Sequence, residues 1–514
     1  MSYLVAFVVG LVVILVTKIW KVLWKPYALT KRFEKQGIKG PPYRFIYGSI
    51  EEMKKLVIAA ADIVLDTNSN DINQKVIPYY HKWSSQYGET MYFWYGMEAR
   101  MTITDPELIK EVLSNKYGFY VRSSVRPTLK TLVGKQSLIF VEGHDWLRQR
   151  KLLNPAFSID KLKIMTKKMA DCTIAMLEGW KNQPLEAYKE TQCMKIEMSQ
   201  EFIKLTYDII AHTAFGSSYG QGKEAFNAQK ELQKCCVAAN SAFFIPGSQY
   251  LPTPSNIRIW KLDSLMKSTL RGIIEKRLRS KDSTKNYGDD LLGTMINGYS
   301  EIAGETKLSV NEILENCKAF FFAGHETTSS LLTWTIFMLS LHREWQERLR
   351  IEVLKECSME IPDADMLAKL KWMNMVLLET LRLYSPIINL LRVLVKDTKL
   401  GNLMIPKGTC IQIPVTKVHR SKEYWGEDAD AFNPFRFGNG VSKAAKHPNA
   451  FIGFGMGPRV CIGQSFAMVE AKIVLALILQ RFSLSLSPEY KHTPINHITL
   501  HPQYGLPIIV KPLS

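Results

Sequence analysis

Hydrophobic and polar positions along the chain follow a helical period over long segments and a two-residue period over short ones. The helical runs are residues 310–341, 344–356, 366–383 and 464–482. The strand-like runs, rich in β-branched or aromatic residues, include 90–95, 99–103, 409–414 and 506–511. The pattern therefore predicts a mainly α fold with a smaller β-rich lobe. Residues 281–290 are polar and turn-rich, which indicates a surface loop.

An apolar run opens the chain. It is uncharged from Tyr3 to Thr17 and continues to Trp24, with two lysines only near its end. A membrane-spanning helix needs about 20 residues, and lysines near one end can reach the interface. A cleaved signal peptide would need a basic start and a small-residue cleavage site, and neither is present. We therefore expect residues 1–25 to form a single-pass transmembrane anchor.

The segment that follows the anchor is basic and rich in proline. Residues 18–44 contain eight Lys or Arg and one acidic residue, Glu34. The positive-inside rule places such a flank in the cytosol. Proline fixes φ and removes a backbone donor, so residues 26–42 are predicted to be a stiff hinge. Residues 43–514 would then form one domain that faces the cytosol.

Composition narrows the classes of function. The chain of 514 residues is 46% hydrophobic, with 66 basic and 48 acidic residues and a net charge of +18. No zinc-finger spacing or RNA-binding aromatic signature accompanies this charge, so a membrane surface and an acidic protein partner are favoured over nucleic acid. The eight cysteines are irregularly spaced, which indicates a reducing compartment rather than a disulfide framework.

One cysteine lies in a distinctive loop. The segment from Phe454 to Gly463 reads FGMGPRVCIG and precedes a predicted helix. Glycines such as Gly455 allow the backbone to turn tightly around Cys461. A thiolate at a helix N-terminus is stabilised by the helix dipole and can serve as a metal ligand. The Gly-x-Gly-x-x-Gly pattern of dinucleotide sites fails here, because neither register has the third glycine.

The spacing Phe-x-x-Gly-x-Arg-x-Cys-x-Gly resembles the haem-ligand loop of cytochromes P450. The resemblance implies that Cys461 is the axial ligand of the iron of haem b. It also implies that Phe454 packs beside the sulfur and that Arg459 pairs with a haem propionate. Gly455 and Gly463 complete the expected cofactor-binding loop.

Two further constellations resemble elements of the same family. Glu379 and Arg382 are three apart on one helical face, where they can pair. An Asn-Pro-Phe-Arg-Phe element downstream is similar to the family's Pro-x-Arg-Phe, which implies that Arg436 completes a buried Glu-Arg-Arg network. Trp146 and Arg150 match the family's Trp-x-x-x-Arg pair that donates to the propionates, although an exposed amphipathic face would show the same spacing.

The long helical run around residue 325 contains Ala-Gly-His-Glu-Thr-Thr, where glycine and threonine are locally unfavourable. Such a departure indicates a functional site. The pattern resembles the family's Ala-Gly-x-Asp/Glu-Thr-Thr motif, in which the helix widens on the oxygen side of the haem. By that match Thr327 is a catalytic hydrogen-bond donor and Glu326 relays protons. A zinc site of the type His-Glu-x-x-His is excluded by Ser329, whereas a polar patch in a core helix stays open for this segment alone.

Residues 36–44 and 447–451 are similar to a plant clan of the family. That clan includes secologanin synthase, enzymes that modify brassinosteroids, gibberellins and cytokinins, and hydroxylases of fatty acids and triterpenoids. Ala323, Ile387 and Ile388 are predicted substrate contacts from their positions relative to the motifs. The stretches expected to choose the substrate are residues 121–132, 238–244 and 387–391.

The resemblance implies a monooxygenase that inserts one atom of O2 into a lipophilic small molecule of terpenoid, fatty-acid or phytohormone type. Its electrons would come from NADPH through NADPH-cytochrome P450 reductase. Two alternatives stay open. One is a haem-dependent isomerase or dehydratase acting on a peroxide, although such relatives often lack the acid-threonine pair. The other is a membrane-bound haem or lipid sensor without turnover, which NADPH-dependent oxygen uptake would distinguish from an enzyme.

Overall fold

The fold was obtained as a computed structural model. It describes residues 2–20, 24–123, 127–181, 193–216, 219–241, 247–279, 287–288, 290–300 and 307–513. Most of the predicted loop at 281–290, and parts of the stretches 121–132 and 238–244, lie outside these residues. Contacts group the chain into two compact units. The first contains Met1–Ser123, Ile388–Ala431 and Val441–Val460, and the second contains Ser124–Ile387, Phe432–Gly440 and Cys461–Ser514.

A sheet with the strand order β1-β2-β8-β5-β3 organises the first unit. Its strands are β1 (Tyr92–Tyr95), β2 (Glu98–Thr102), β3 (Tyr120–Arg122), β5 (Asn389–Leu394) and β8 (Cys410–Pro414). β1 and β2 form an antiparallel hairpin, and β2 runs parallel to β8. Every residue of β8 is buried, as expected for a central strand that is covered on both faces.

Short helices and a two-stranded ribbon surround this sheet. They are α2 (Lys25–Glu34), α3 (Ile50–Ala61), α4 (Asn73–Val76), α5 (Pro78–Tyr87), α6 (Pro106–Ser114), α18 (Val415–Val418), α19 (Lys422–Trp425), β6 (Thr398–Leu400) and β7 (Leu403–Ile405). The core joins residues distant in sequence, since Phe33, Trp94, Ile109 and Ile411 are all buried in one apolar cluster. Burial of this apolar surface is the main force that closes the unit.

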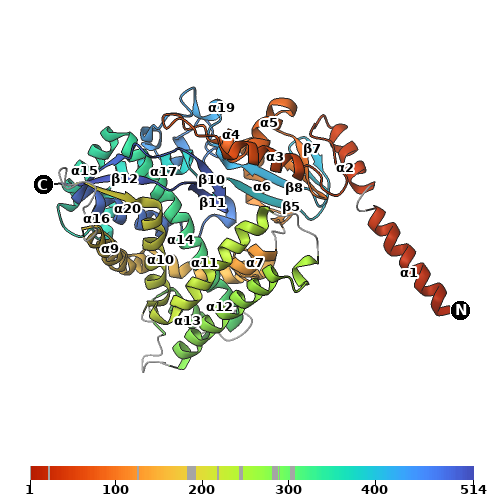
Figure 1. The fold of residues 1–514 in the computed structure, drawn as a ribbon, viewed down its shortest axis with the longest axis horizontal. Helices are drawn as coiled ribbons and strands as arrows, with labels where there is room; N and C mark the ends of the chain where they lie inside the picture. Colours follow the sequence, from red (N-terminus) through yellow and green to blue (C-terminus); the bar gives the residue numbers. More distant parts are fainter. Residues whose placement is uncertain are drawn as a thin grey trace. The chain divides into compact units, whose positions relative to one another are not determined.

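The second unit is built around the long helix α14 (Val310–Leu341), which runs beside α10 (Met198–Phe215) and α17 (Lys371–Leu383) (Figure 1). Ser309 and Glu312 form a reciprocal capping box that fixes where α14 begins. From residue 313 to residue 340 the side chains of α14 are buried, except at three positions in its middle.

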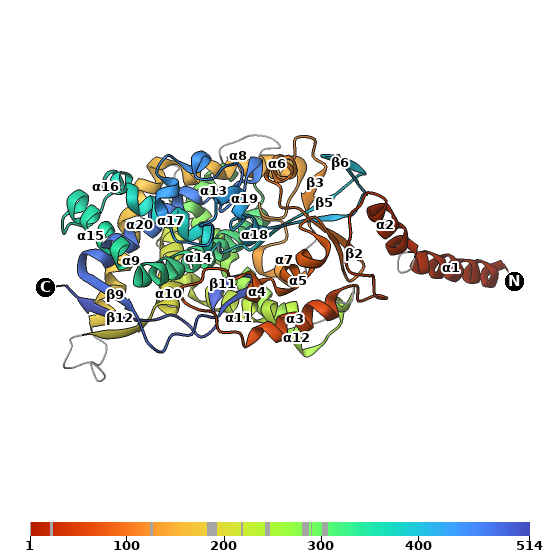
Figure 2. The same ribbon diagram turned by 90° about the horizontal axis from the view of Figure 1, so that it is seen from above.

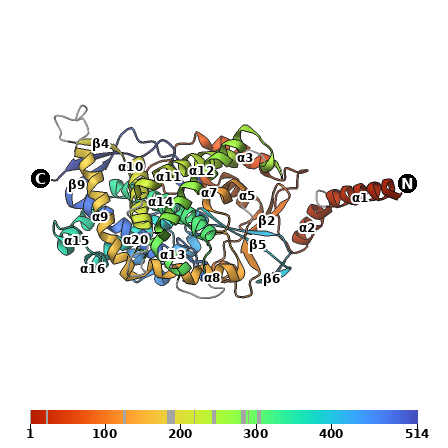
Figure 3. The same cartoon turned by 90° about the horizontal axis from the view of Figure 1, so that it is seen from below.

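The other helices of the second unit pack around α14 or around each other. They are α7 (Pro127–Val133), α8 (Gly143–Leu153), α9 (Ile159–Lys181), α11 (Tyr219–Ser241), α12 (Pro254–Arg279), α13 (Leu291–Ser300), α15 (Arg343–Cys357), α16 (Ala364–Lys369) and α20 (Gln464–Arg481). Helices α11 and α12 lie side by side (Figure 3).

Two small sheets complete the second unit. In the first, β12 (Pro507–Pro512) is the central strand between β4 (Met194–Glu197) and β9 (Phe482–Leu486), and β9 and β12 are seen side by side in Figure 2. The second is the hairpin β10 (Pro494–His497) and β11 (Thr499–Pro502), in which Asn496 pairs with Leu500. Strand β11 contacts α14, so the hairpin brings its side chains to the middle of that helix.

The predicted fold class and most predicted elements are confirmed. Helix α14 has the predicted bounds, and the four strand-like runs are strands within about two residues of their predicted ends. The prediction of one helix over 366–383 was wrong, because Leu370 leaves the helical region with φ −72° and ψ 81°. Its side chain is completely buried, so packing overrides the local helical preference.

The N-terminal apolar run forms α1, Ser2–Ile19. Within the part of the chain that the structure describes, no helix combines the length and the hydropathy that a membrane crossing requires. The structure describes this run only up to residue 20 and again from residue 24. The anchor predicted for residues 1–25 is therefore not shown.

Candidate active site

The middle of α14 carries the predicted oxygen-side residues. Ala323, Gly324 and Thr327 are partly exposed where the rest of the helix is buried. Because they are spaced i, i+1 and i+4, they form one stripe on the helix surface. The Thr327 hydroxyl donates to the Ala323 carbonyl at 2.7 Å. The widening implied by the family motif is not present as a break, since α14 is helical throughout.

Glu326 points away from this stripe into a polar cluster from the β10–β11 hairpin. Its Oε1 accepts a hydrogen bond from the Thr499 hydroxyl at 2.7 Å and lies 2.9 Å from His501 Nε2. Thr499 Oγ1 and His501 Nε2 are themselves 2.7 Å apart. Sequence reasoning missed both partners, because they are more than 170 residues from Glu326 and only the tertiary fold brings them together.

The adjacent side chains Glu326 and His325 differ in charge at neutral pH. Burial raises the pKa of the Glu326 carboxyl, but the hydrogen bond and charge of His501 outweigh burial and bring the pKa down to about 2. Burial lowers the pKa of the adjacent His325 to about 4. At neutral pH the helix therefore presents an ionised carboxylate beside an uncharged imidazole.

Cys461 lies three residues before α20, whose N-cap is Gly463. It is the exposed cysteine of the eight, all of which lie within the described residues. Burial raises the pKa of Cys172, Cys236 and Cys410 to about 12, so these side chains remain thiols at neutral pH. The environment thus sets Cys461 apart from the structural cysteines.

The loop that leads to Cys461 needs its glycines. Gly455 and Gly457 have φ of +75° and +72°, a region that other residues rarely adopt. A Cβ at residue 457 would lie 2.4 Å from the Leu113 carbonyl oxygen, so only glycine fits there. Phe454 and Arg459 flank this turn and are half-buried.

The predicted propionate donors lie on α8. Trp146 and Arg150 are both half-buried and lie four residues apart on the helix. Burial lowers the pKa of the Arg150 guanidinium, and the charge of Cys461 partly opposes this shift. The structure therefore brings Arg150 into electrostatic contact with Cys461, which sequence spacing alone could not show.

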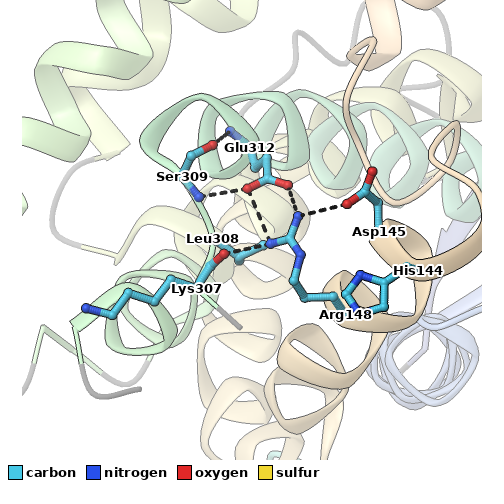
Figure 4. Close-up of a pocket in the computed structure, with 7 residues that line it drawn as sticks. All are labelled: His144, Asp145, Arg148, Lys307, Leu308, Ser309 and Glu312. Atoms are coloured by element: carbon cyan, nitrogen blue, oxygen red, sulfur yellow. Dashed lines mark hydrogen bonds and ion pairs between the residues drawn. The ribbon is translucent and has the colours of Figure 1, made fainter. Parts of the chain in front are cut away.

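A neighbouring ion pair ties α8 to the start of α14. Figure 4 shows Arg148 pointing between Asp145 and Glu312, at a cavity of about 510 Å³. Arg148 forms an ion pair with Glu312 and donates to the Lys307 carbonyl at 2.6 Å. Glu312 also closes the capping box of Ser309, so one carboxylate fixes both the helix start and the position of α8.

Glu379, Arg382 and Arg436 come together in the second unit. The Glu379 and Arg382 side chains are 0% exposed and share two hydrogen bonds of 2.7 and 2.8 Å. Arg436 Nε lies 3.6 Å from Glu379 Oε1, which also accepts from the Asn433 amide at 2.9 Å. The three charges form one buried and partnered group, as such groups must.

The predicted substrate residues differ in accessibility. Ala323 belongs to the exposed stripe of α14, and Ile387 is 37% exposed. Ile388 is only 4% exposed and is part of the core of the first unit. Ile388 is therefore poorly placed to contact a ligand.

These residues fit a haem group. A cysteine that is accessible before a helix can supply a thiolate, and Arg150 beside it can supply a cation for a carboxylate. On α14, the partly exposed stripe carries only the small side chains of Ala323 and Thr327 and the glycine Gly324.

Comparison with known proteins identifies the class. The Cytochrome P450 family profile matches residues 64–508. Cytochrome P450 709B1 of Arabidopsis thaliana is 53% identical over 494 residues, covering 96% of this chain and 95% of that protein. Secologanin synthase 1 of Catharanthus roseus is 40% identical over 510 residues, covering 96% and 95%. A solved structure of retinoic acid-bound cyanobacterial CYP120A1 has a TM-score of 0.72 at 24% identity and covers 84% of this chain and 93% of that chain, which supports the fold.

The chain therefore belongs to the cytochrome P450 family. It is an oxidoreductase of the haem-thiolate monooxygenase type, with haem iron as its cofactor. Its curated relatives include plant cytochromes P450 and secologanin synthase, so the predicted resemblance is confirmed. As a member of this family, it works on a small molecule with electrons from a redox partner.

Proposed function

We propose that this monooxygenase inserts one atom of O2 into a lipophilic small molecule of terpenoid, fatty-acid or phytohormone type. NADPH-cytochrome P450 reductase would supply the electrons. The observation that carries the proposal is the middle of α14, where Thr327 lies on the accessible stripe and the adjacent Glu326 is ionised. A threonine on the accessible side and an ionised carboxylate at the preceding position of the helix are suited to proton delivery in oxygen activation, and an isomerase has no need of them.

The cofactor residues would be those of the cysteine loop and α8. Haem with a thiolate ligand supplies oxygen binding and activation. Cys461 would donate the thiolate, and Phe454 would pack beside the sulfur. Arg459, Trp146 and Arg150 would donate to the propionates, with Gly455 and Gly463 shaping the loop.

Two residues of α14 would deliver the protons that oxygen activation requires. The Thr327 hydroxyl donates to the Ala323 carbonyl, so its oxygen lone pairs can accept a hydrogen bond on the accessible side. Glu326 is the nearest ionised group along the helix and would replace the protons that the hydroxyl gives up. The Glu379-Arg382-Arg436 network would hold α17 in place and take no part in proton transfer.

The proposal includes the membrane. Residues 1–25 would anchor the chain to the endoplasmic reticulum, and residues 43–514 would face the cytosol. The proline-rich residues 26–42, predicted as a hinge, would link them through α2, whose Phe33 packs into the core of the first unit. The apolar start of α1 and the basic segment after it support this arrangement. Deleting residues 1–25 should release much of the protein from tight membrane association, which sedimentation after carbonate and detergent washes would measure.

Substrate choice would depend on the accessible stripe of α14 and on Ile387, since both offer apolar surface. One relative is named for the synthesis of secologanin, which supports a small-molecule substrate. Metabolite profiling of a host that expresses this chain with a reductase would identify the product.

The ligand assignment is tested by Cys461→Ala. The reduced protein with carbon monoxide should lose the red-shifted Soret band that a thiolate ligand produces. Cys235→Ala is the control, because that side chain is half-buried on α11, outside the glycine loop, and the band should be unchanged. Retention of the band in Cys461→Ala would assign the ligand to another residue.

The oxygen-side assignment is tested by Thr327→Ala. Haem binding should survive, while product per NADPH falls sharply and hydrogen peroxide rises, because the hydroxyl no longer directs protons. Thr335→Ala is a matched control, since Thr335 makes the same bond to the carbonyl four residues earlier, at 2.8 Å, in a fully buried part of α14. Equal coupling in both variants would remove Thr327 from the mechanism.

A further inference from the structure

The β10–β11 hairpin brings a histidine to the carboxylate of the proposed proton relay. Glu326 is 4% exposed as a side chain, whereas His501 is 16% exposed. Thr499 is 1% exposed and bridges them, because its hydroxyl lies 2.7 Å from both Glu326 Oε1 and His501 Nε2. His501 is therefore the member of this triad through which protons can enter from water.

The surroundings of His501 leave Glu326 as its one ionised acidic neighbour among the described groups that act on the cluster. From α14, His325 also faces Glu326, and its pKa of about 4 keeps it neutral. From β10, His497 acts on both His501 and Glu326. Lys230 of α11 acts on His325. Among the described residues, Glu326 is the carboxylate that forms an ion pair with His501.

We propose that His501 is a positioning residue for oxygen activation: it orients the Glu326 carboxylate, keeps it ionised at neutral pH and passes it protons from solvent. The proposal rests on the proposed function. It adds a partner that the α14 motif does not contain.

The proton balance is simple. A proton that leaves the Thr327 hydroxyl would be replaced by a proton from Glu326. The Glu326 carboxylate would then need a new proton. His501 would then pass a ring proton from Nε2 to Glu326 Oε1 across the 2.9 Å contact, and a proton from bulk water would replace it on the ring. No electron moves in these transfers, and the only co-reactant is water.

The first test needs neither substrate nor reductase. Burial raises the pKa of the Glu326 carboxyl, and the hydrogen bond and charge of His501 are the first influences that oppose it, so removal of His501 should raise this pKa. In His501→Ala, an infrared pH titration should therefore show the protonated carboxyl band of Glu326 at a higher pH than in the wild type. His501→Ala/Glu326→Gln should not show it. Glu470, whose pKa burial also raises, contributes equally to all three proteins and cancels in the difference.

The second test measures coupling. His501→Gln keeps a hydrogen-bond donor near Glu326 but cannot relay a proton, so product per NADPH should fall several-fold and its pH profile should change. Thr499→Val, which removes the bridging hydroxyl, should lower coupling less. Asn496→Ala, at an exposed position of the same hairpin, should match the wild type.

The outcomes separate this proposal from the proposed function. If wild type makes product with NADPH and reductase but His501→Gln has the same coupling and pH profile, the role of His501 is refuted and the monooxygenase stands. If the infrared band of His501→Ala appears at the same pH as in the wild type, His501 does not keep Glu326 ionised. If wild type itself consumes no oxygen with NADPH, the proposed function fails, whatever the infrared result.

Discussion

The Glu379 carboxylate has no exposed surface, and both of its oxygens accept hydrogen bonds from Arg382. Oε1 also accepts the Asn433 amide and faces Arg436. A charge in this environment is tolerated only because every partner is present. The sequence could predict this group from two short motifs, because i, i+3 spacing places Glu379 and Arg382 on one helical face.

Glu379→Ala should destabilise the protein by about 3–5 kcal/mol, because it leaves the buried Arg382 without its carboxylate. Haem incorporation should fall with it. Urea unfolding and haem content measure the two effects. The control is Asp365→Ala, which removes an exposed partner of Lys163 and should cost less than about 1 kcal/mol. Similar losses in both variants would show that the Glu379 network is not a buried unit in solution.

His325 is a second residue with a measurable consequence. Its pKa falls from 6.5 to about 4 on folding, so the unfolded chain binds a proton between these values and the folded chain does not. Stability is therefore complete above about pH 6.5 and decreases as the pH falls toward 4, by about 3 kcal/mol at the lower end.

His325→Gln should remove this contribution. Free energies of unfolding measured between about pH 4 and 7 should then depend less steeply on pH than in the wild type. His81→Gln, at an exposed position of α5, provides the comparison and should keep the wild-type slope. An unchanged slope in His325→Gln would mean that His325 is not buried as a neutral imidazole.

The residue scale also shows where sequence reasoning ends. Cys461, Thr327 and Glu326 are found by motif, because their neighbours along the chain carry the pattern. His501 and Thr499 carry no such pattern, since β11 meets α14 only after the chain has folded. A sequence motif identifies functional residues within one segment, but it does not identify their partners in another segment.

At the scale of elements, the start of α14 coincides with a local sequence signal, whereas the helix interruption at Leu370 does not. Ser309 and Glu312 are three apart and predict a capping box, and α14 begins there. The interruption at Leu370 lies between two lysines, with no glycine or proline to mark it. The burial of the Leu370 side chain accounts for the interruption, and burial depends on tertiary packing rather than on the local sequence.

The cap of α14 can be tested alone. Ser309→Ala removes the hydroxyl that accepts from the Glu312 amide and should cost about 1 kcal/mol of stability. Ser421→Ala is the matched control, because Ser421 also precedes a helix but makes no capping bond, and its effect should stay below about 0.5 kcal/mol. Thermal unfolding of the two variants side by side gives the answer.

At the scale of the whole molecule, the family and fold class were predictable because motifs spread from residue 146 to residue 463 all agree. The division into two compact units could not be predicted, because the chain passes between the units several times. Sequence order shows neighbours along the chain, whereas the units gather segments that lie hundreds of residues apart.

The net charge of +18 belongs to this scale and predicts a salt effect. If a basic surface docks an acidic reductase, the rate of haem reduction by the reductase should fall as salt increases, because ions screen exposed charges beyond about 10 Å at 0.1 M. Reduction by dithionite serves as the control and should change little. If the rate of haem reduction by the reductase does not change with salt concentration, docking does not depend on charge.

Strand β12 occupies the last residues that the structure describes, yet it is the central strand between β4 and β9. Its partners are made early and late in synthesis, and β4 must wait for more than 300 residues before Ile508 can pair with Ile196. During translation β4 is an unpaired edge, open to association with other chains. The sheet can close only after β12 has been synthesised, so a chain cut short before β12 would leave β4 and β9 without the strand that joins them.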